Sequence, residues 1–117
     1  MIKPSFKSKY SPAQRYSEAK RILRKYPDRI PVIAELSHNS SLTLDKTKYL
    51  VPCDLSVGQF IYVIRKRLNL PPEKAIFLFT ENNTLPPTGS LMSNVYEYYR
   101  DTDLFLYFII SEESVFG

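Results

Sequence analysis

The chain has 117 residues, 44% of them apolar and 24% charged, which suits one globular domain with a sizeable core and excludes a disordered chain. The longest unbroken apolar run, Leu104 to Ile110, spans seven residues. A membrane-crossing helix takes about 20 residues, so we expect none here. The single cysteine, Cys53, excludes an internal disulfide framework. One cysteine and one histidine are too few ligands for a structural zinc site. We therefore expect a cytoplasmic protein without a secretory signal.

The net charge of +4 is unevenly distributed along the sequence. Residues 1–30 carry nine Lys and Arg against two acidic residues, a net charge of +7, whereas the remainder carries −3. This asymmetry predicts a basic face for an acidic partner, which could be nucleic acid, anionic lipid or an acidic peptide. The simpler interpretation is a solvated helix face.

Helix signals come first in sequence order. Ser11 and Gln14 flank Pro12 as a capping box, which predicts a helix that Pro27 ends. Its apolar stripe at helical spacing is Tyr16, Ala19, Leu23 and Tyr26. Residues 1–10 have room for one short helical turn.

Strands alternate with helices over the rest of the sequence. Residues 29–36 alternate apolar and polar side chains, which is typical of a strand. We expect a short strand over residues 48–51, whose brevity and flanking lysine suggest a sheet edge. A second capping box opens a helix over 56–68, with a stripe of Val57, Ile61, Ile64 and Leu68.

The last third of the sequence completes the pattern. We expect a strand over 75–80, a turn at 81–83, a helix over 91–99 and a strand over 104–110. The final strand is apolar at every position, so both of its faces should be buried and it should be central in the sheet. The order helix, strand, strand, helix, strand, helix, strand indicates an α+β fold of the β-grasp type.

Four stretches resemble the autophagy ubiquitin-like modifiers of the GABARAP type. They are YPDRIPVI at 26–33, LDKTKYLVPCDLSVGQFIYVIRKRL at 44–68, LPPTGSLMSNVYE at 85–97 and DLFLYFIISEESVFG at 103–117. The resemblance implies a ubiquitin-like β-grasp, a mixed four-stranded sheet on a crossover helix, with an N-terminal helical extension. It implies an extension over residues 1–26, packed on a domain over 27–117 whose conjugation tail is 112–117.

The resemblance also implies a chemistry for the end of the sequence. In the family, activating and conjugating enzymes pass a terminal glycine carboxylate to the amine of phosphatidylethanolamine, and deconjugating enzymes release it. Gly117 meets the requirement, because a residue without a Cβ enters a narrow enzyme site. Two acyl chains anchor a protein stably to a bilayer. The implied location is therefore the cytoplasm and, after lipidation, the autophagosomal membrane, with the vacuole or lysosome as further destinations.

A short sheet edge beside apolar residues suits the addition of a peptide strand. The resemblance implies an adaptor or cargo-receptor peptide with an aromatic-x-x-aliphatic motif. The pocket for the aromatic side chain would be lined by Glu18, Ile22, Pro31, Lys48, Leu50 and Phe105. The pocket for the aliphatic side chain would be lined by Tyr49, Val51, Pro52, Leu55, Phe60, Val63, Ile64 and Arg67. The basic rim would be Arg29, Lys46, Lys48 and Arg67.

The residue pattern offers separate support for this surface. Ile22, Phe60 and Val63 lie outside the apolar stripes of their helices, and such residues are candidates for a contact surface. Wide core stripes are the alternative interpretation. We expect Leu50→Ala or Arg67→Ala to weaken the peptide without unfolding the domain.

Two other functions fit the sequence less well. Catalysis is not expected, because Cys53 has no recognisable activating partner and the three widely spaced glycines cannot form a phosphate-binding loop; no cofactor is expected either. A polyanion or nucleic-acid binder is the runner-up, in which the first long helix supplies Lys20, Arg21, Arg24 and Lys25 together with Tyr16 and Tyr26. Because both tyrosines share the predicted core stripe, nucleic acid is not expected as a partner. The resemblance also allows association with microtubules.

Overall fold

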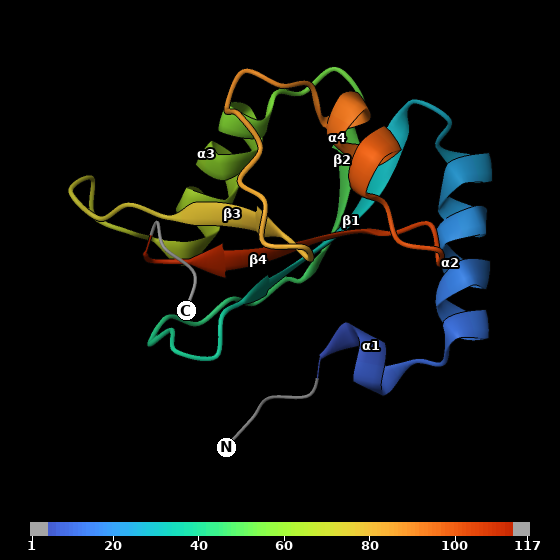
Figure 1. Ribbon diagram of the computed structural model, residues 1–117, viewed down its shortest axis with the longest axis horizontal. Helices are drawn as coiled ribbons and strands as arrows, with labels where there is room; N and C mark the ends of the chain where they lie inside the picture. The colour runs from blue at the N-terminus through green and yellow to red at the C-terminus, as the bar shows by residue number, and fades with distance from the viewer. Residues whose placement is uncertain (1–4, 114–117) are drawn as a thin grey trace.

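The computed structural model describes residues 5–113. Figure 1 shows two helices at the start of the chain, then two strands, and then helices and strands in alternation. In order they are α1 (Phe6–Lys9), α2 (Pro12–Lys25), β1 (Arg29–Leu36), β2 (Lys48–Pro52), α3 (Val57–Leu68), β3 (Phe77–Thr80), α4 (Met92–Tyr99) and β4 (Leu106–Ser111). Every predicted element is present, including the short helical turn near the N-terminus. The conjugation tail from residue 114 onward, with Gly117, lies outside the described residues.

The four strands form one mixed sheet in the order β2-β1-β4-β3. The two inner strands, β1 and β4, run parallel, and each pairs with its outer neighbour in antiparallel fashion. The α+β fold class and the mixed four-stranded sheet are thereby confirmed. The prediction that the second strand is an edge and the last strand is central is also confirmed.

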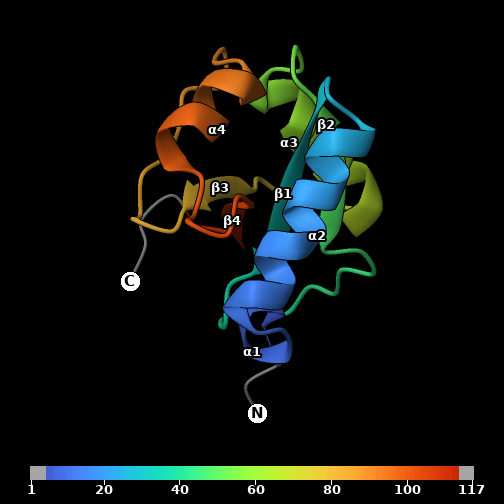
Figure 2. The same ribbon diagram turned by 90° about the vertical axis from the view of Figure 1, so that its right-hand side faces the viewer.

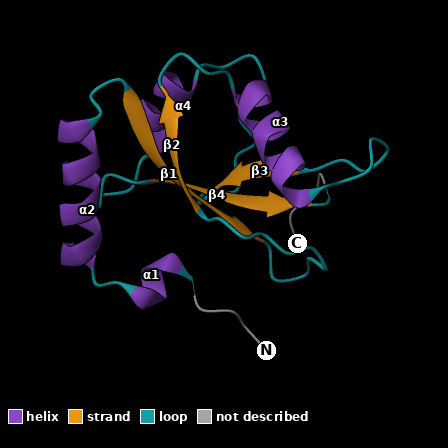
Figure 3. Cartoon of the chain, turned by 180° about the vertical axis from the view of Figure 1, so that it is seen from behind, coloured by secondary structure: helices purple, strands orange, loops and turns teal. Residues whose placement is uncertain are grey.

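Each face of the sheet is covered by helices. Figure 2 shows α2 lying across the near face, and Figure 3 shows the strands between α2 on one side and α3 on the other. Even-numbered residues of β1 such as Val32 pack toward α3 and α4, whereas Ile33 packs toward α2. In β4, Phe108 faces the first group and Tyr107 the second. Strand side chains alternate between faces, and β4 is therefore apolar at successive positions.

Local signals account for the helix ends. Both predicted capping boxes form: Ser11 Oγ accepts the Gln14 N–H, and Ser56 Oγ accepts the Gln59 N–H. At the other end of α3, Asn69 adopts the left-handed conformation with φ of 53° and closes the helix. Asparagine tolerates this conformation better than most residues do.

Several boundaries differ from the predictions by one or two residues. β4 begins at Leu106 rather than Leu104, because Leu104 has φ of 72° and cannot continue an extended strand. β3 begins at Phe77, the first residue that pairs with β4. α4 begins at Met92, because Leu91 is in an extended conformation and acts as the N-cap.

The predicted phase of α2 is wrong, whereas the predicted stripe of α3 is confirmed but too narrow. In α2 the buried residues are Arg15, Ala19 and Ile22, whereas Tyr16 is 44% exposed. In α3, Phe60 is buried at 1% exposure, so it belongs to the core stripe. Ile22 and Phe60 are therefore core residues and do not form an exposed contact surface. Of the three side chains assigned to a contact surface by this reasoning, only Val63 is exposed, at 39%.

The short α1 is docked against the α2 side of the sheet. The Phe6 ring lies 5.1 Å from the Phe105 ring, and the Phe6 N–H donates to the Glu35 carboxylate at 2.9 Å. Lys7 pairs with Glu81 at 2.6 Å and lies over the Tyr107 ring. These contacts tie the start of the described residues to the sheet.

Candidate functional site

The outer edge of β2 carries the candidate site. At the ends of its pairing with β1, the Cys53 N–H donates to the Asp28 carbonyl and the Ala34 N–H donates to the Thr47 carbonyl. In an antiparallel pair, hydrogen-bonded positions alternate with positions whose backbone groups point away from the partner. The register pairs Leu50 with Pro31 and Lys48 with Ile33, so both fall at the outward positions. The N–H and C=O groups of Lys48 and Leu50 consequently face the free edge.

The side chains of β2 alternate between the two faces of the sheet. Leu50 packs against the cluster that contains Ile22 of α2 and Phe105. Tyr49 and Val51 belong to the opposite cluster, which α3 supplies. A strand added to this edge would therefore have one apolar environment above the sheet and another below it.

The residues assigned to the aromatic pocket lie on the α2 side of this edge. Ile22, Pro31 and Phe105 are buried, whereas Leu50 and Lys48 are partly exposed. Ile22 and Phe105 are only 1% and 0% exposed, so they form the floor below Leu50 rather than a wall. The side chains around them must move for an aromatic ring to reach this floor.

Two ion pairs of Glu18 lie beside the residues assigned to the aromatic pocket. The Lys48 ammonium donates to Glu18 Oε2 at 2.8 Å, and the Arg21 Nε donates to Glu18 Oε1 at 2.6 Å. The hydrogen bond from Arg21, followed by the one from Lys48, lowers the pKa of Glu18 to about 2. Glu18 is therefore ionised at neutral pH and holds the Lys48 ammonium against α2.

The residues assigned to the aliphatic pocket lie on the α3 side. Tyr49, Val51, Phe60 and Ile64 are buried, whereas the accessible residues are Pro52, Leu55, Val63 and Arg67. Phe60 meets the Tyr49 ring edge-on at 5.5 Å. The buried group forms a packed floor, and the accessible group forms its border.

The rim cations are held differently from one another. Arg67 Nη2 lies 3.5 Å from Asp45 Oδ2, and the Lys46 ammonium lies 5.1 Å from the Tyr49 ring centre. The Arg29 guanidinium donates to the backbone carbonyl of Leu50 at 3.2 Å. Asp45 and the Arg29 contact were not predicted, because neither has a signal in the local sequence.

A buried polar cluster on the α2 side of the sheet was also missed. Asp103 is 4% exposed and accepts hydrogen bonds from Arg15 at 2.5 Å and from the Phe105 N–H at 2.8 Å. The Tyr107 hydroxyl donates to the same carboxylate. Burial, followed by this hydrogen bond, raises the pKa of Tyr107. The only available signal was an arginine on the apolar side of α2, which becomes apparent once the helix phase is known.

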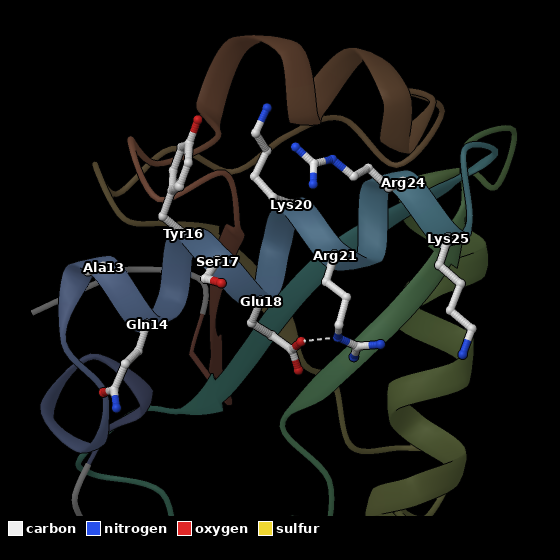
Figure 4. A pocket seen from close by; sticks show the side chains of 9 residues that line it. All are labelled: Ala13, Gln14, Tyr16, Ser17, Glu18, Lys20, Arg21, Arg24 and Lys25. Carbon is white, nitrogen blue, oxygen red and sulfur yellow. Dashed lines mark hydrogen bonds and ion pairs between the residues drawn. The ribbon is translucent and has the colours of Figure 1, made fainter.

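The outer face of α2 is the second candidate surface, and Figure 4 shows it from close by. Tyr16, Lys20 and Arg24 point to one flank, whereas Glu18 and Arg21 form their ion pair on the other. The Lys20 ammonium lies 5.8 Å from the exposed Tyr16 ring. The expectation that Tyr16 is a packing residue is therefore wrong, and a basic surface with an accessible aromatic ring is present.

Cys53 is half-buried, and its backbone groups bond to Asp28 and Ser93. Across residues 5–113, no group of three or more His, Cys, Asp or Glu is arranged to hold a metal ion. Over the same residues, none of the helices has both the length and the apolar character needed to cross a bilayer.

Comparison with known sequences gives a consistent result. A family described as autophagy protein Atg8, ubiquitin like, matches residues 14–117. Autophagy-related protein 8 of Candida glabrata is 57% identical over 117 residues, which cover 99% of this chain and 98% of that protein. Autophagy-related protein 8B of Oryza sativa subsp. indica is 56% identical over 118 residues, with 100% and 98% coverage.

Solved structures are similar over nearly the whole sequence. The crystal structure of Trypanosoma brucei ATG8 has a TM-score of 0.88 at 41% identity and covers 99% of this chain and 100% of that one. Plasmodium falciparum Atg8 in complex with a Plasmodium falciparum Atg3 peptide has a TM-score of 0.86 at 39% identity, with 96% and 98% coverage.

Proposed function

Because the chain belongs to the Atg8 family of ubiquitin-like autophagy proteins, we propose that its β2 edge binds aromatic-x-x-aliphatic peptides and that Gly117 is joined to phosphatidylethanolamine. The autophagy role follows from the family. The peptide and lipid partners are our proposal, and so is a non-catalytic role for the protein. Each of the two partners is argued and tested separately below.

One observation carries the peptide proposal: the two apolar environments at the β2 edge lie on opposite faces of the sheet. Leu50 belongs to the α2 side, and Tyr49 and Val51 belong to the α3 side. In an extended peptide, residues three positions apart point to opposite faces. An aromatic and an aliphatic residue separated by two others would therefore reach one environment each, while the peptide backbone bonds to Lys48 and Leu50.

A structural neighbour supports a peptide ligand of this kind. The Plasmodium falciparum Atg8 structure contains a peptide from Plasmodium falciparum Atg3. We expect peptides from conjugating enzymes, adaptors and cargo receptors to use the β2 edge of this protein. Because Phe60, Ile64 and Ile22 are almost fully buried, the peptide side chains would displace the border residues before reaching the floor.

The test varies both the peptide spacing and the protein. Four fluorescent peptides would carry the aromatic and aliphatic residues separated by one, two, three or four others, and affinity would be measured by anisotropy. Separations of two and four residues place the side chains on opposite faces, and only a separation of two fits two adjacent pockets. We expect the two-residue spacing to bind best, and equal affinity at all spacings would refute the geometry.

Leu50→Ala should weaken the best peptide at least several-fold, because Leu50 borders the first pocket. Leu85→Ala is the matched control, since Leu85 is 45% exposed and follows β3 at the opposite edge of the sheet. Unfolding in urea would show that both variants stay folded. If the two variants bound the peptide equally well, the pocket assignment would be wrong.

The lipid proposal rests on the family and needs a chemical test. The protein would be incubated with family activating and conjugating enzymes, ATP and phosphatidylethanolamine vesicles, and its intact mass would be measured with Gly117→Ala alongside. An ATP-dependent lipid adduct that the variant lacks is expected. If no adduct formed while the same enzymes modified a family relative, lipid conjugation of this protein would be excluded. Lipidated protein would then be sought on autophagosomal, vacuolar and lysosomal membranes.

A second function remains open because Tyr16 is exposed. The outer face of α2 presents Lys20 and Arg24 beside this ring, which suits a polyanion such as nucleic acid or the acidic surface of a microtubule. Such binding should weaken steeply with salt, whereas binding in apolar pockets should not. A salt series with RNA, microtubules and the motif peptide distinguishes the two modes.

A further inference from the structure

The connection between β1 and β2 lies beside the end of β4 (Figure 1). β1 ends at Leu36, which pairs with Ile110 of β4. The next residue, Ser37, donates its N–H to the Ile110 carbonyl at 2.9 Å, so the parallel pairing continues one step beyond β1. β4 itself ends at Ser111, and Glu112 is the first residue that follows the sheet. The connection therefore reaches the point where the conjugation tail begins.

Ser40 of this connection holds the first residue of the tail. Its hydroxyl donates to Glu112 Oε2 at 3.0 Å, across 72 positions of the sequence. The same hydroxyl accepts the Leu42 N–H at 3.1 Å, and the Ser40 N–H donates to the Ser37 carbonyl at 3.1 Å. The backbone of the connection therefore sets the direction of the hydroxyl. Bonds from Ser37 and from Ser40 join the connection to the chain on either side of the end of β4.

The two sides of the contact differ in how firmly the rest of the protein holds them. In the connection, Leu44 is partly buried and packs against the core cluster on the α3 side. After β4, Glu112 and Glu113 are both exposed, and we call these two residues the root of the tail. Among residues 5–113, no lysine or arginine lies within ion-pair distance of Glu112. The packed connection therefore positions the exposed root, rather than the reverse.

A second hydroxyl bends the chain locally at the same point. The Ser111 hydroxyl accepts the Glu113 N–H at 3.1 Å and donates to the Glu113 carbonyl at 3.0 Å. This local turn is typical of serine, and it sets the shape of the root but not its direction relative to the sheet. The bond from Ser40 supplies that direction, because it comes from a separate part of the chain.

We propose that Ser40 is a positioning residue for conjugation: its hydrogen bond to Glu112 sets the direction in which the tail leaves β4, and so presents Gly117 to the activating and conjugating enzymes. This inference rests on the proposed lipid conjugation. Gly117 follows Glu112 by five positions, and an enzyme that takes up the terminal glycine must order the residues before it. A root that is already held loses less conformational entropy on binding. Ser40 therefore acts on the binding of the tail and leaves the chemical step unchanged.

The test compares four variants of the full chain with wild type. Ser40→Ala removes the hydroxyl, Ser40→Thr keeps one, and Ser40→Asp places a second carboxylate beside Glu112. Ser41→Ala is the matched control, because Ser41 is the exposed neighbour in the same connection. The initial rate of ATP-dependent loading onto the family activating enzyme would be measured against protein concentration, which gives KM and kcat separately.

We expect Ser40→Ala to raise KM about two- to tenfold with kcat unchanged, which is the effect of losing one hydrogen bond. Ser40→Asp should raise KM further, because its charge repels Glu112, and the additional rise should shrink at high salt. Ser40→Thr and Ser41→Ala should match wild type. An unchanged KM in Ser40→Ala, or a fall in kcat alone, would overturn the proposal.

A double variant shows whether Ser40 acts through Glu112. Glu112→Ala removes the acceptor and serves as the reference for Glu112→Ala combined with Ser40→Ala. If the contact carries the positioning, the second substitution should change KM no further. Additive effects of the two substitutions would mean that Ser40 acts by another route, and the proposal would be wrong.

An enzyme-free measurement separates this inference from the proposed function. The NMR order parameters of the Glu112 and Glu113 backbone N–H groups should fall in Ser40→Ala and stay constant in Ser41→Ala. Order parameters that do not fall overturn the positioning role, whatever the enzymes do. If they fall, but wild type is not loaded while the same enzyme loads a family relative, lipid conjugation is what fails, although Ser40 still orders the root of the tail.

Discussion

Replacing Asp103 by alanine tests whether the buried polar cluster holds the α2 side of the sheet together. The carboxylate is 4% exposed and accepts hydrogen bonds from Arg15 and from the Phe105 N–H, at 2.5 and 2.8 Å, and a third from Tyr107. Asp103→Ala leaves all three donors without this acceptor, and one of them is charged. The substitution is therefore more severe than the loss of a single hydrogen bond.

The expected magnitude follows from these contacts. Removing one partner of a buried ion pair destabilises a protein by about 3–5 kcal/mol, and each unsatisfied neutral donor adds about 1–3 kcal/mol when water cannot reach it. The Arg15 side group is 10% exposed, so some water reaches it and the lower part of the range applies. We expect Asp103→Ala to lower the free energy of unfolding by at least about 3 kcal/mol, the lower end of the ion-pair range, with the two neutral donors adding to the loss.

Urea unfolding followed by circular dichroism measures this loss. Asp101→Ala is the matched control, because Asp101 lies in the same connection and its ion pair with Lys7 is longer, at 3.3 Å. It should cost less than about 1 kcal/mol. Arg15→Met should restore part of the stability in the Asp103→Ala background by removing the unpaired charge. A loss under about 1 kcal/mol for Asp103→Ala would refute the reasoning.

Three further predictions concern charge and helix ends. The raised pKa of Tyr107 contributes stability that is fully present below about pH 10 and is lost at higher pH. Tyr107→Phe should therefore lose less of its free energy of unfolding, measured in urea, as the pH rises. An equal loss in the variant and in wild type would contradict this. The lowered pKa of Glu18 contributes stability that is present above about pH 4.5 and is lost toward about pH 2. Glu18→Gln should therefore lose less stability than wild type on acidification. An equal loss in both proteins would count against this role of Glu18. Asn69→Ala should cost about 1 kcal/mol in thermal unfolding, because alanine disfavours the left-handed C-cap, whereas Asn69→Gly should cost nothing; equal losses would contradict this.

Element type and order were predictable because their signals are local. The capping boxes at Ser11 and Ser56 fix where α2 and α3 begin, since the hydroxyl and the backbone groups that it bonds lie three residues apart. The uniformly apolar segment that contains β4 predicted a central strand, because both faces of a central strand are buried. The lysine beside a short strand predicted an edge at β2.

The phase of the helices was less predictable. In α2, Ala19 fits two overlapping stripes, one with Tyr16 and one with Ile22, and helical spacing alone does not separate them. The presence of Asp103 on the neighbouring connection decided the outcome, because it draws Arg15 to the buried side and leaves Tyr16 exposed. A partner 88 residues away in the sequence has no local signature.

Some features of the candidate site were likewise predictable from the sequence, and others depended on the tertiary structure. The sequence by itself predicted the elements and the edge character of β2, and the family resemblance named candidate residues for two peptide pockets at that edge. Only the tertiary structure decided which of them are floor and which are accessible, because that depends on how α2 and α3 pack on opposite faces of the sheet. It also decided that Arg29 bonds to the Leu50 carbonyl, because strand register brings together groups 21 positions apart. Local propensity acts over a few residues, whereas register and packing join distant ones.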